Sequence, residues 1–340
     1  MDKRIFSALC ELDGVSGHEE AVRNYIVDCL KETGTPMEIT VDGMGNLLVH
    51  LIGREHAHKK VQFDAHMDEV GFIITHINED GTLCFDTLGR MNDHMLFGRR
   101  VRIGGNIGVI GGKAIHQCEK DEKTKVPTMD AMRIDLGCES KEAVSKLVSL
   151  GDVGTFDNGI TWFNEDIFCG KAVDDRVGCA LLLELAKEQP QRDIWLSFSV
   201  QEELGLRGAG VATEAIHPDF AVAIDATTAA DTPGNAGAAT VCCVGKGAVV
   251  PFADGATLYE HELYKRVHAL AEQNGIPAQT KTKIAGANNA GAIQRRHSGV
   301  HTITVSLPCR YIHSPACLGS AADVDSMARL LKLLALELTQ

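Results

Sequence analysis

Histidines and carboxylates occur in five short segments, each next to an apolar run that is typical of a buried strand or helix. The segments are "DAHMDEVGF", "GKAVDDRVG", "VQEELG", "AVAIDATTAADTPG" and "LPCRYIHSP". Nitrogen and carboxylate-oxygen donors of this kind are accepted as ligands by zinc, cobalt and manganese. Taken singly, each segment also fits an ordinary polar residue or a helix cap. The side chains in question are His66, Asp68, Asp174, Asp175, Glu202, Glu203, Asp225 and His313.

Taken together, these side chains match the requirements of a two-metal hydrolytic site. Two divalent ions about 3.5 to 4 Å apart need a bridging carboxylate and roughly one histidine and one carboxylate each. One carboxylate remains after these ligands are assigned. Hydrolysis needs such a residue, because the general base cannot itself be a metal ligand. The adjacent pair Glu202 and Glu203 could supply a ligand and a base, or it could be a solvated pair at a strand-to-helix turn.

Alternating helix and strand patterns surround these segments. From Gly170 onward, helical periods such as "DDRVGCALLLELAKEQ" alternate with strand-like runs such as "DIWLSFSV" and "HTITVSLP". This alternation favours a largely parallel sheet with helices on both faces, and such sheets hold their sites at the carboxyl ends of the strands. Near the N-terminus, Ser16 and Glu19 have the spacing of a capping box before a helix that Gly34 would end.

A segment without this helix–strand alternation separates the N-terminal part of the pattern from the C-terminal part. Between about residues 73 and 165 the chain consists of short β-rich runs broken by Gly, Asn and Asp. We therefore expect an α/β fold: a three-layer domain formed by residues 1–72 and 166–340, with a mainly parallel centre and helices on both faces, interrupted by a small inserted β-barrel-like domain over 73–165. The charged stretch "CEKDEKTKVPTMDA" predicts an exposed loop in the insert.

Composition excludes several classes of function. The net charge of −13 over 340 residues disfavours a nucleic-acid partner, which would need clustered Lys and Arg. The apolar runs are too short to cross a bilayer and no signal-peptide pattern begins the chain, so we expect a cytoplasmic protein without a membrane partner. The 11 cysteines are odd in number and form no C-x-x-C pair, which favours reduced, buried thiols.

The order of the motifs resembles the M42 family of metallo-aminopeptidases, which includes glutamyl and tetrahedral aminopeptidases. The resemblance spans "SGHE", "AHMDEVGF", "MRIDLG", "GDVGTFD", "GKAVDDRVGC", "EELGLRGA", "DTPG" and "RYIHSP". It implies two divalent metal ions per subunit, Zn²⁺ or Co²⁺ with Mn²⁺ also compatible. His66 and Asp225 would be the terminal ligands of one ion, Glu203 and His313 those of the other, and Asp174 the bridge. Glu202 would be the general base, and Asp68 would orient His66 through its other ring nitrogen.

The expected reaction is removal of N-terminal residues from peptides by a water that the two metals activate and Glu202 deprotonates. The resemblance also implies a homo-oligomer, from dimer to dodecamer, with the insert making contacts. Two alternatives stay open: a related di-metal deacylase or carboxypeptidase-type hydrolase, and a non-catalytic assembly or peptide-binding homologue. One departure stands out, because Asn288 and Asn289 in "AGANNAGAIQ" replace the Thr-Asp pair usual in the family, which bears on substrate preference.

Overall fold

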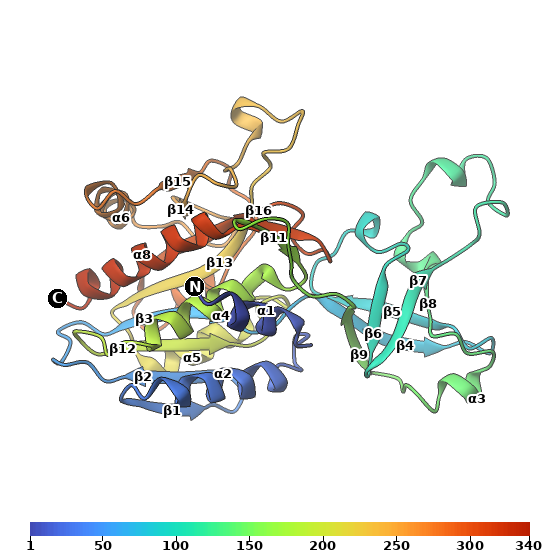
Figure 1. The fold of residues 1–340 in the computed structure, drawn as a ribbon, viewed down its shortest axis with the longest axis horizontal. Helices are drawn as coiled ribbons and strands as arrows, with labels where there is room; N and C mark the ends of the chain where they lie inside the picture. Colours follow the sequence, from blue (N-terminus) through green and yellow to red (C-terminus); the bar gives the residue numbers. More distant parts are fainter.

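An eight-stranded sheet covered by helices lies beside a closed β-barrel (Figure 1). The structure is a computed structural model that describes the backbone of residues 1–340 and every side chain except that of Ala238. Strands β3, β12, β13 and β16 form the parallel centre of the sheet, in the order β12-β3-β13-β16. Their carboxyl ends therefore meet at one edge.

The outer strands of the sheet are partly antiparallel. The hairpin β1–β2 pairs with β12 on one side, and β14 pairs antiparallel with β16 on the other, with β15 parallel to β14 at the edge. The strands are β1 (Met37–Val41), β2 (Leu47–Leu51), β3 (Val61–His66), β12 (Ile194–Ser199), β13 (Phe220–Thr228), β14 (Ala248–Pro251), β15 (Ala278–Lys281) and β16 (His301–Cys309).

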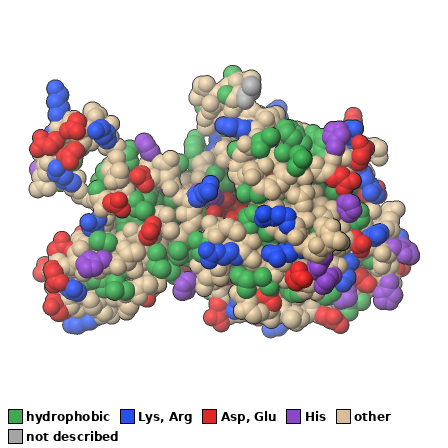
Figure 2. Space-filling view, turned by 180° about the vertical axis from the view of Figure 1, so that it is seen from behind, with side chains coloured by type: hydrophobic (Ala, Val, Ile, Leu, Met, Phe, Trp, Pro, Cys, Tyr) green, Lys and Arg blue, Asp and Glu red, His purple; other side chains and the backbone are tan. Residues whose placement is uncertain are grey.

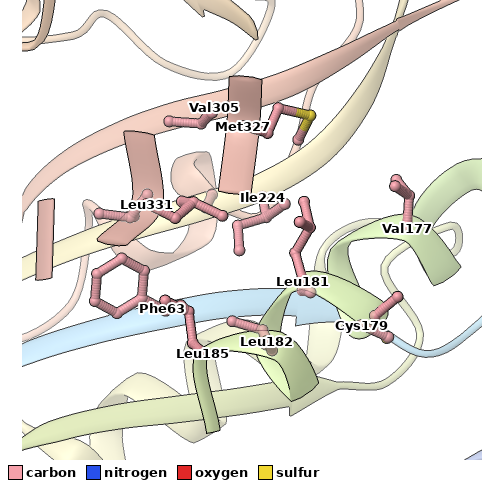
Figure 3. Packing of buried hydrophobic residues seen from close by; sticks show 14 of the residues in the cluster. Phe63, Val177, Cys179, Leu181, Leu182, Leu185, Ile224, Val305, Met327 and Leu331 are labelled. Atoms are coloured by element: carbon pink, nitrogen blue, oxygen red, sulfur yellow. The ribbon is translucent and has the colours of Figure 1, made fainter. Parts of the chain in front are cut away.

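Helices cover both faces of the sheet. Helices α4 (Val173–Ala186) and α8 (Ala321–Leu338) pack on one face, joined there by α1 (Lys3–Glu11), α2 (Glu20–Thr33) and α6 (His261–Gln273). The opposite face carries α5 (Arg207–Ile216) and α7 (Ala290–Ile293). Helix α4 is buried on nearly all sides because α1, α2 and α8 enclose it against the sheet. Figure 3 shows Leu181 and Leu182 of α4 packed near Phe63, Ile224 and Leu331.

The barrel has its own apolar core. Its strands are β4 (Gly71–Ile77), β5 (Leu83–Leu88), β6 (Arg100–Ile103), β7 (Asn106–Gly111), β8 (Arg133–Asp135) and β9 (Val153–Phe156), all paired antiparallel. Phe72 meets Phe85 and Phe156 edge to face inside it. The long connection from β7 to β8 protrudes and carries both basic and acidic side chains (Figure 2). The short helix α3 (Lys141–Val144) lies between β8 and β9.

A small sheet follows the barrel in the chain. Strand β10 (Thr161–Trp162) pairs with β11 (Ile167–Gly170), and β11 pairs with β17 (Cys317–Ser320), so the segment just before α4 is joined to the segment that follows β16. This places the start of α4 close to the carboxyl end of β16.

The expected fold class is confirmed: a parallel-centred sheet with helices on both faces and an inserted closed barrel. The domain limits of 73 and 165 stay a prediction. The predicted capping box is wrong, because α2 begins at Glu20 and the Ser16 hydroxyl donates to Asp68 instead. Among the described residues, no helix is long and apolar enough to cross a membrane.

Candidate active site

The carboxyl edge of the parallel strands brings together the side chains predicted from the sequence. His66 is the last residue of β3, Asp225 lies in β13, Glu202 and Glu203 follow β12, and His313 follows β16. Asp174 joins them from the start of α4. Potential ligand atoms lie within 4.8 Å of one another in three overlapping groups, namely His66–Asp174–Asp225, His66–Glu202–Glu203 and Asp174–Glu203–His313.

Asp174 lies between the two histidines. Its Oδ1 is 3.2 Å from His66 Nε2, and its Oδ2 is 3.2 Å from His313 Nε2. His313 Nε2 is also 3.2 Å from Glu203 Oε1. One carboxylate oxygen thus faces each imidazole, which is the arrangement that a carboxylate bridging two cations requires.

Backbone carbonyls determine how the two imidazole rings are oriented. His66 Nδ1 is 3.0 Å from the carbonyl oxygen of Asp68, and His313 Nδ1 is 2.7 Å from that of Arg90. A carbonyl only accepts, so each Nδ1 donates and each Nε2 is left to face the carboxylates. The expected contact between His66 and the Asp68 carboxylate is longer, at 3.4 Å, than the contact with the Asp68 carbonyl.

The Asp68 carboxylate instead anchors the turn that carries the two glutamates. It accepts hydrogen bonds from the backbone N–H of Glu202 at 2.9 Å and of Glu203 at 3.1 Å, and from the Ser16 hydroxyl at 2.6 Å. Asp68 is fully buried. Sequence reasoning missed the contact with Ser16, although the "SGHE" motif contains this residue.

The electrostatics of the cluster fit two divalent cations. Burial raises the pKa of Glu202 well above its usual value, and the nearby Glu203 and Asp174 carboxylates add to the rise against the effect of His66. Burial also raises the pKa of Asp225, with Asp174 and Glu202 adding to it. Buried carboxylates that crowd one another need positive charge nearby. Burial lowers the pKa values of His66 and His313, but the neighbouring carboxylates raise them by more, and two imidazoles can carry at most two charges among four carboxylates. The donor set therefore suits metal ions.

A buried cationic network beneath the site was not predicted. The Arg176 guanidinium donates to the carbonyl oxygens of Met67, at 2.8 Å, and Leu12, at 3.1 Å, while Lys171 Nζ lies 2.7 Å from Glu69 Oε1. Arg176 and Lys171 are essentially inaccessible to solvent. They fix the segment between β3 and β4 that contains Asp68. Both residues flank the aspartate pair in "GKAVDDRVG", but the motif alone does not show what they contact.

The two asparagines that depart from the family pattern are buried and hydrogen-bonded. Asn289 Nδ2 donates to Asp64 Oδ2 at 2.8 Å and to Ser199 Oγ at 2.9 Å. Asn288 Nδ2 donates to Asp254 Oδ2 at 3.2 Å. Asp64 is fully buried two residues before His66.

The barrel contributes to the surroundings of the site. A recess is lined by Phe156 of β9 together with Asp174, Glu203 and His313. Arg90, whose carbonyl accepts from His313, lies in the connection between β5 and β6. The inserted barrel therefore both borders the site and helps to orient one of its histidines.

The sequence pattern of M42 glutamyl aminopeptidases matches residues 45–330. The chain belongs to this M42 family. It is accordingly a peptidase, a hydrolase that acts on peptide bonds. This M42 peptidase is 32% identical to the lysyl aminopeptidase of Pyrococcus furiosus, over 99% of this chain and 98% of that protein.

Solved structures of two other peptidases share the fold over nearly the whole chain. The aminopeptidase APDkam598 of Desulfurococcus kamchatkensis superposes with a TM-score of 0.91 at 32% identity, covering 97% of the M42 peptidase described here and 92% of that chain. The TET1 peptidase of Pyrococcus horikoshii, which can assemble into a tetrahedron or a large octahedral shell, gives a TM-score of 0.86 at 31% identity, with 98% of each chain covered.

Proposed function

We propose that this M42 peptidase removes N-terminal residues from peptides at a two-metal site. The observation that carries the proposal is the position of Asp174, which presents one oxygen to His66 and the other to His313. A carboxylate between two histidines, with further carboxylates beside each of them, is the donor set of a paired divalent site.

In this proposal the ligands divide into two sets. His66 and Asp225 serve one ion, Glu203 and His313 serve the other, and Asp174 serves both. Zn²⁺ and Co²⁺ suit these donors, and Mn²⁺ is also compatible. When bound, the ions acidify a water molecule and polarise the scissile carbonyl.

Glu202 is the proposed general base. Its side chain lies within the cluster, 8% of the residue is exposed, and its backbone is held by Asp68. A carboxylate fixed in this way can take a proton from the attacking water and pass it to the departing amine. Asp68 contributes by positioning, since it holds the backbone of Glu202 and its carbonyl orients His66.

The likeness to aminopeptidases supports action at a free N-terminus. One relative is the lysyl aminopeptidase of Pyrococcus furiosus, which is 32% identical over nearly the whole of both chains. A zinc-type ion accepts an amine nitrogen as a ligand, so one of the two ions would hold a free α-amino group, whose lone pair an acylated amine lacks. We therefore favour an aminopeptidase over a deacylase or a carboxypeptidase-type enzyme.

A substrate panel tests the reaction class. The protein is reconstituted with Zn²⁺ or Co²⁺ and assayed on aminoacyl-anilides, on the same compounds with acetylated amines, and on N-acyl amino acids. We expect hydrolysis of the free-amine anilides alone, and acetylation should abolish it. Cleavage of the N-acyl amino acids in preference would favour the deacylase. No hydrolysis, together with less than one metal ion per chain, would favour a non-catalytic homologue.

We also propose that the protein forms a homo-oligomer with the barrel at subunit contacts. The support is the likeness to a TET peptidase that assembles into shells, together with exposed apolar side chains on the barrel, such as Ile107 and Leu150, which are 54% and 63% exposed. Light scattering should give a mass between that of a dimer and that of a dodecamer. A monomer at all concentrations would contradict the proposal.

A further inference from the structure

Two histidines and a glutamate meet at the opposite edge of the sheet from the candidate active site. Glu214 lies in the last turn of α5, His217 follows the end of that helix, and His297 lies in the turn after α7. One potential ligand atom from each residue lies within 4.8 Å of the other two. The nearby Asp219 accepts from the backbone N–H of Lys60, just before β3 begins, so the group lies at the amino ends of the strands. Figure 2 shows histidines gathered at the end of the sheet away from the barrel.

The side chain of His297 is oriented so that one ring nitrogen remains available. Its Nε2 is 3.2 Å from the carbonyl oxygen of Thr213, which can only accept, so Nε2 donates. Nδ1 is then the nitrogen with the free lone pair, and it lies 3.6 Å from Glu214 Oε1. A ring held by a backbone carbonyl on one side and open on the other is the usual arrangement of a metal-binding histidine.

His217 is held close to Glu214 and His297. Its backbone N–H also bonds to the Thr213 carbonyl, at 2.9 Å, and its ring lies over that of His297 with the centroids 3.7 Å apart and the planes 24° apart. One carbonyl therefore anchors both histidines, although 80 residues separate them in the chain. The His297 side chain is only 18% exposed, whereas that of Glu214 is 59% exposed and free to adjust.

We propose that Glu214, His217 and His297 form a second metal site, which binds a zinc-type divalent ion. Two imidazoles and a carboxylate, with water in the fourth position, complete a tetrahedral zinc shell. Ligand atoms around such an ion lie about 3.4 Å apart, because each zinc bond is about 2.1 Å long. The 3.6 Å between His297 Nδ1 and Glu214 Oε1 is close to this value. A metal lies in the plane of the imidazole that binds it, so the exposed His217 ring would turn out of its stacked position over His297 in order to bind the same ion.

An ion at this site would join α5 to the turn after α7. Helix α5 and the residue before α7 also bind strand β3 directly, because Thr213 donates to Gln62 and Asn289 donates to Asp64. The bound ion would therefore stabilise the folded state without contributing to the reaction. This role does not depend on the proposed aminopeptidase activity.

Metal counting and thermal unfolding test the site. Chelator-stripped protein is equilibrated with micromolar Zn²⁺, and bound zinc is measured by mass spectrometry in the wild type and in a His217→Ala/His297→Ala variant. We expect the variant to hold one ion per chain fewer and to lose part of the zinc-dependent rise in Tm, a few degrees in size. Peptide hydrolysis should be unchanged. Equal zinc content in both proteins, or filling of the site only at millimolar zinc, would overturn the proposal.

Two further variants separate ligand loss from damage to the fold. Glu214→Gln keeps both stacked rings and removes one ligand, so zinc should bind at least tenfold more weakly at this site while the Tm without metal stays the same. His301→Ala removes a histidine whose Nδ1 lies 2.7 Å from Glu260 Oε2, outside the proposed site, and should leave zinc content unchanged. Unaltered zinc affinity in Glu214→Gln, or an equal loss in His301→Ala, would contradict the assignment.

Discussion

Glu202 and Glu203 are neighbours in the chain, yet their surroundings differ. Glu203 Oε1 lies 3.2 Å from His313 Nε2, while Glu202 is the carboxylate left over once each proposed metal has its ligands. The Asp68 carboxylate holds the backbone N–H groups of both. At the scale of single residues, the proposed division between ligand and base therefore depends on a turn that one buried aspartate organises.

Substitution of each glutamate should have a different effect. Glu202→Gln should keep both metals and lower kcat by about 10² to 10⁴-fold or more, because only the proton acceptor is lost. Glu203→Gln should lose metal as well as activity. Metal content and steady-state kinetics, measured for both variants, distinguish the loss of a base from the loss of a metal ligand. Near-normal turnover in Glu202→Gln would show that the base is another group.

Ser16 should influence activity through Asp68. Ser16→Ala removes a 2.6 Å hydrogen bond to the Asp68 carboxylate, and one such bond to a charged group is worth about 1.5 to 3 kcal/mol. We expect kcat to fall by about tenfold with the metal content retained, because the glutamate turn is held less firmly. Ser326→Ala, which removes a hydrogen bond to Ala322 within α8, is the control. Equal kcat in both variants would exclude this positioning role.

At the scale of elements, the connection between β16 and β17 has to present His313 to the cluster. Its two ends are joined, because Arg310 and Leu318 exchange backbone hydrogen bonds of 3.0 and 2.9 Å. The Arg310 guanidinium also contacts both oxygens of Asp231, at 2.6 and 2.8 Å. Asp231 therefore holds the loop that carries a proposed ligand.

The pair formed by Asp231 and Arg310 should make stability depend on pH. The hydrogen bond from Arg310 lowers the pKa of Asp231 below its usual 3.8. A lowered carboxyl pKa stabilises the fold above the unfolded value, and this contribution is lost as the pH falls through the folded value. Urea unfolding should show Asp231→Asn less stable than the wild type by about 1 to 2 kcal/mol at pH 7.

This difference should persist down to about pH 4 and shrink below that value, because both proteins then have an uncharged group at position 231. Asp325→Asn, on the exposed face of α8, serves as the matched control and should change stability little at any pH. A difference between Asp231→Asn and the wild type that stayed constant from pH 7 to pH 3 would show that the ion pair is not its source.

At the scale of the whole molecule, acidic side chains lie together where the four parallel strands end. The barrel borders this site on one side. Such a site is costly without cations, since each buried carboxylate loses its hydration. Metal ions that bind only the folded chain should therefore stabilise it as well as activate it.

Removal of metal should affect both properties. A chelator should abolish hydrolysis and lower the Tm, and Zn²⁺ or Co²⁺ should restore both. At a free metal concentration of 100 times the Kd, each site contributes about 2.7 kcal/mol to stability. Full activity in an exhaustively metal-free preparation would refute the two-metal proposal. The His217→Ala/His297→Ala variant, which retains the catalytic cluster, is the control for metal bound elsewhere.

Much of the fold, and the location of the candidate site, can be predicted from local patterns in the sequence. The alternation of helix and strand periods indicated the parallel-centred sheet, and the Gly- and Asn-broken runs indicated the barrel, because hydrophobic periodicity reports which faces become buried. The polar residues next to strand ends indicated where a site would form, since parallel strands end at one edge. This reasoning marked His66, Asp174 and His313 as candidate ligands, and the structure brings their side chains together.

Only the tertiary structure decided which polar groups pair. Ser16 has the spacing of a helix cap but bonds to Asp68, 52 residues away, and the Arg176 side chain donates to the carbonyls of residues 109 and 164 positions away in the chain. His217 and His297 share a carbonyl although nothing in their local sequence relates them. Hydrogen bonds and metal ligation act over a few ångströms between segments distant in the chain, so periodicity can place an element but cannot name its polar partners.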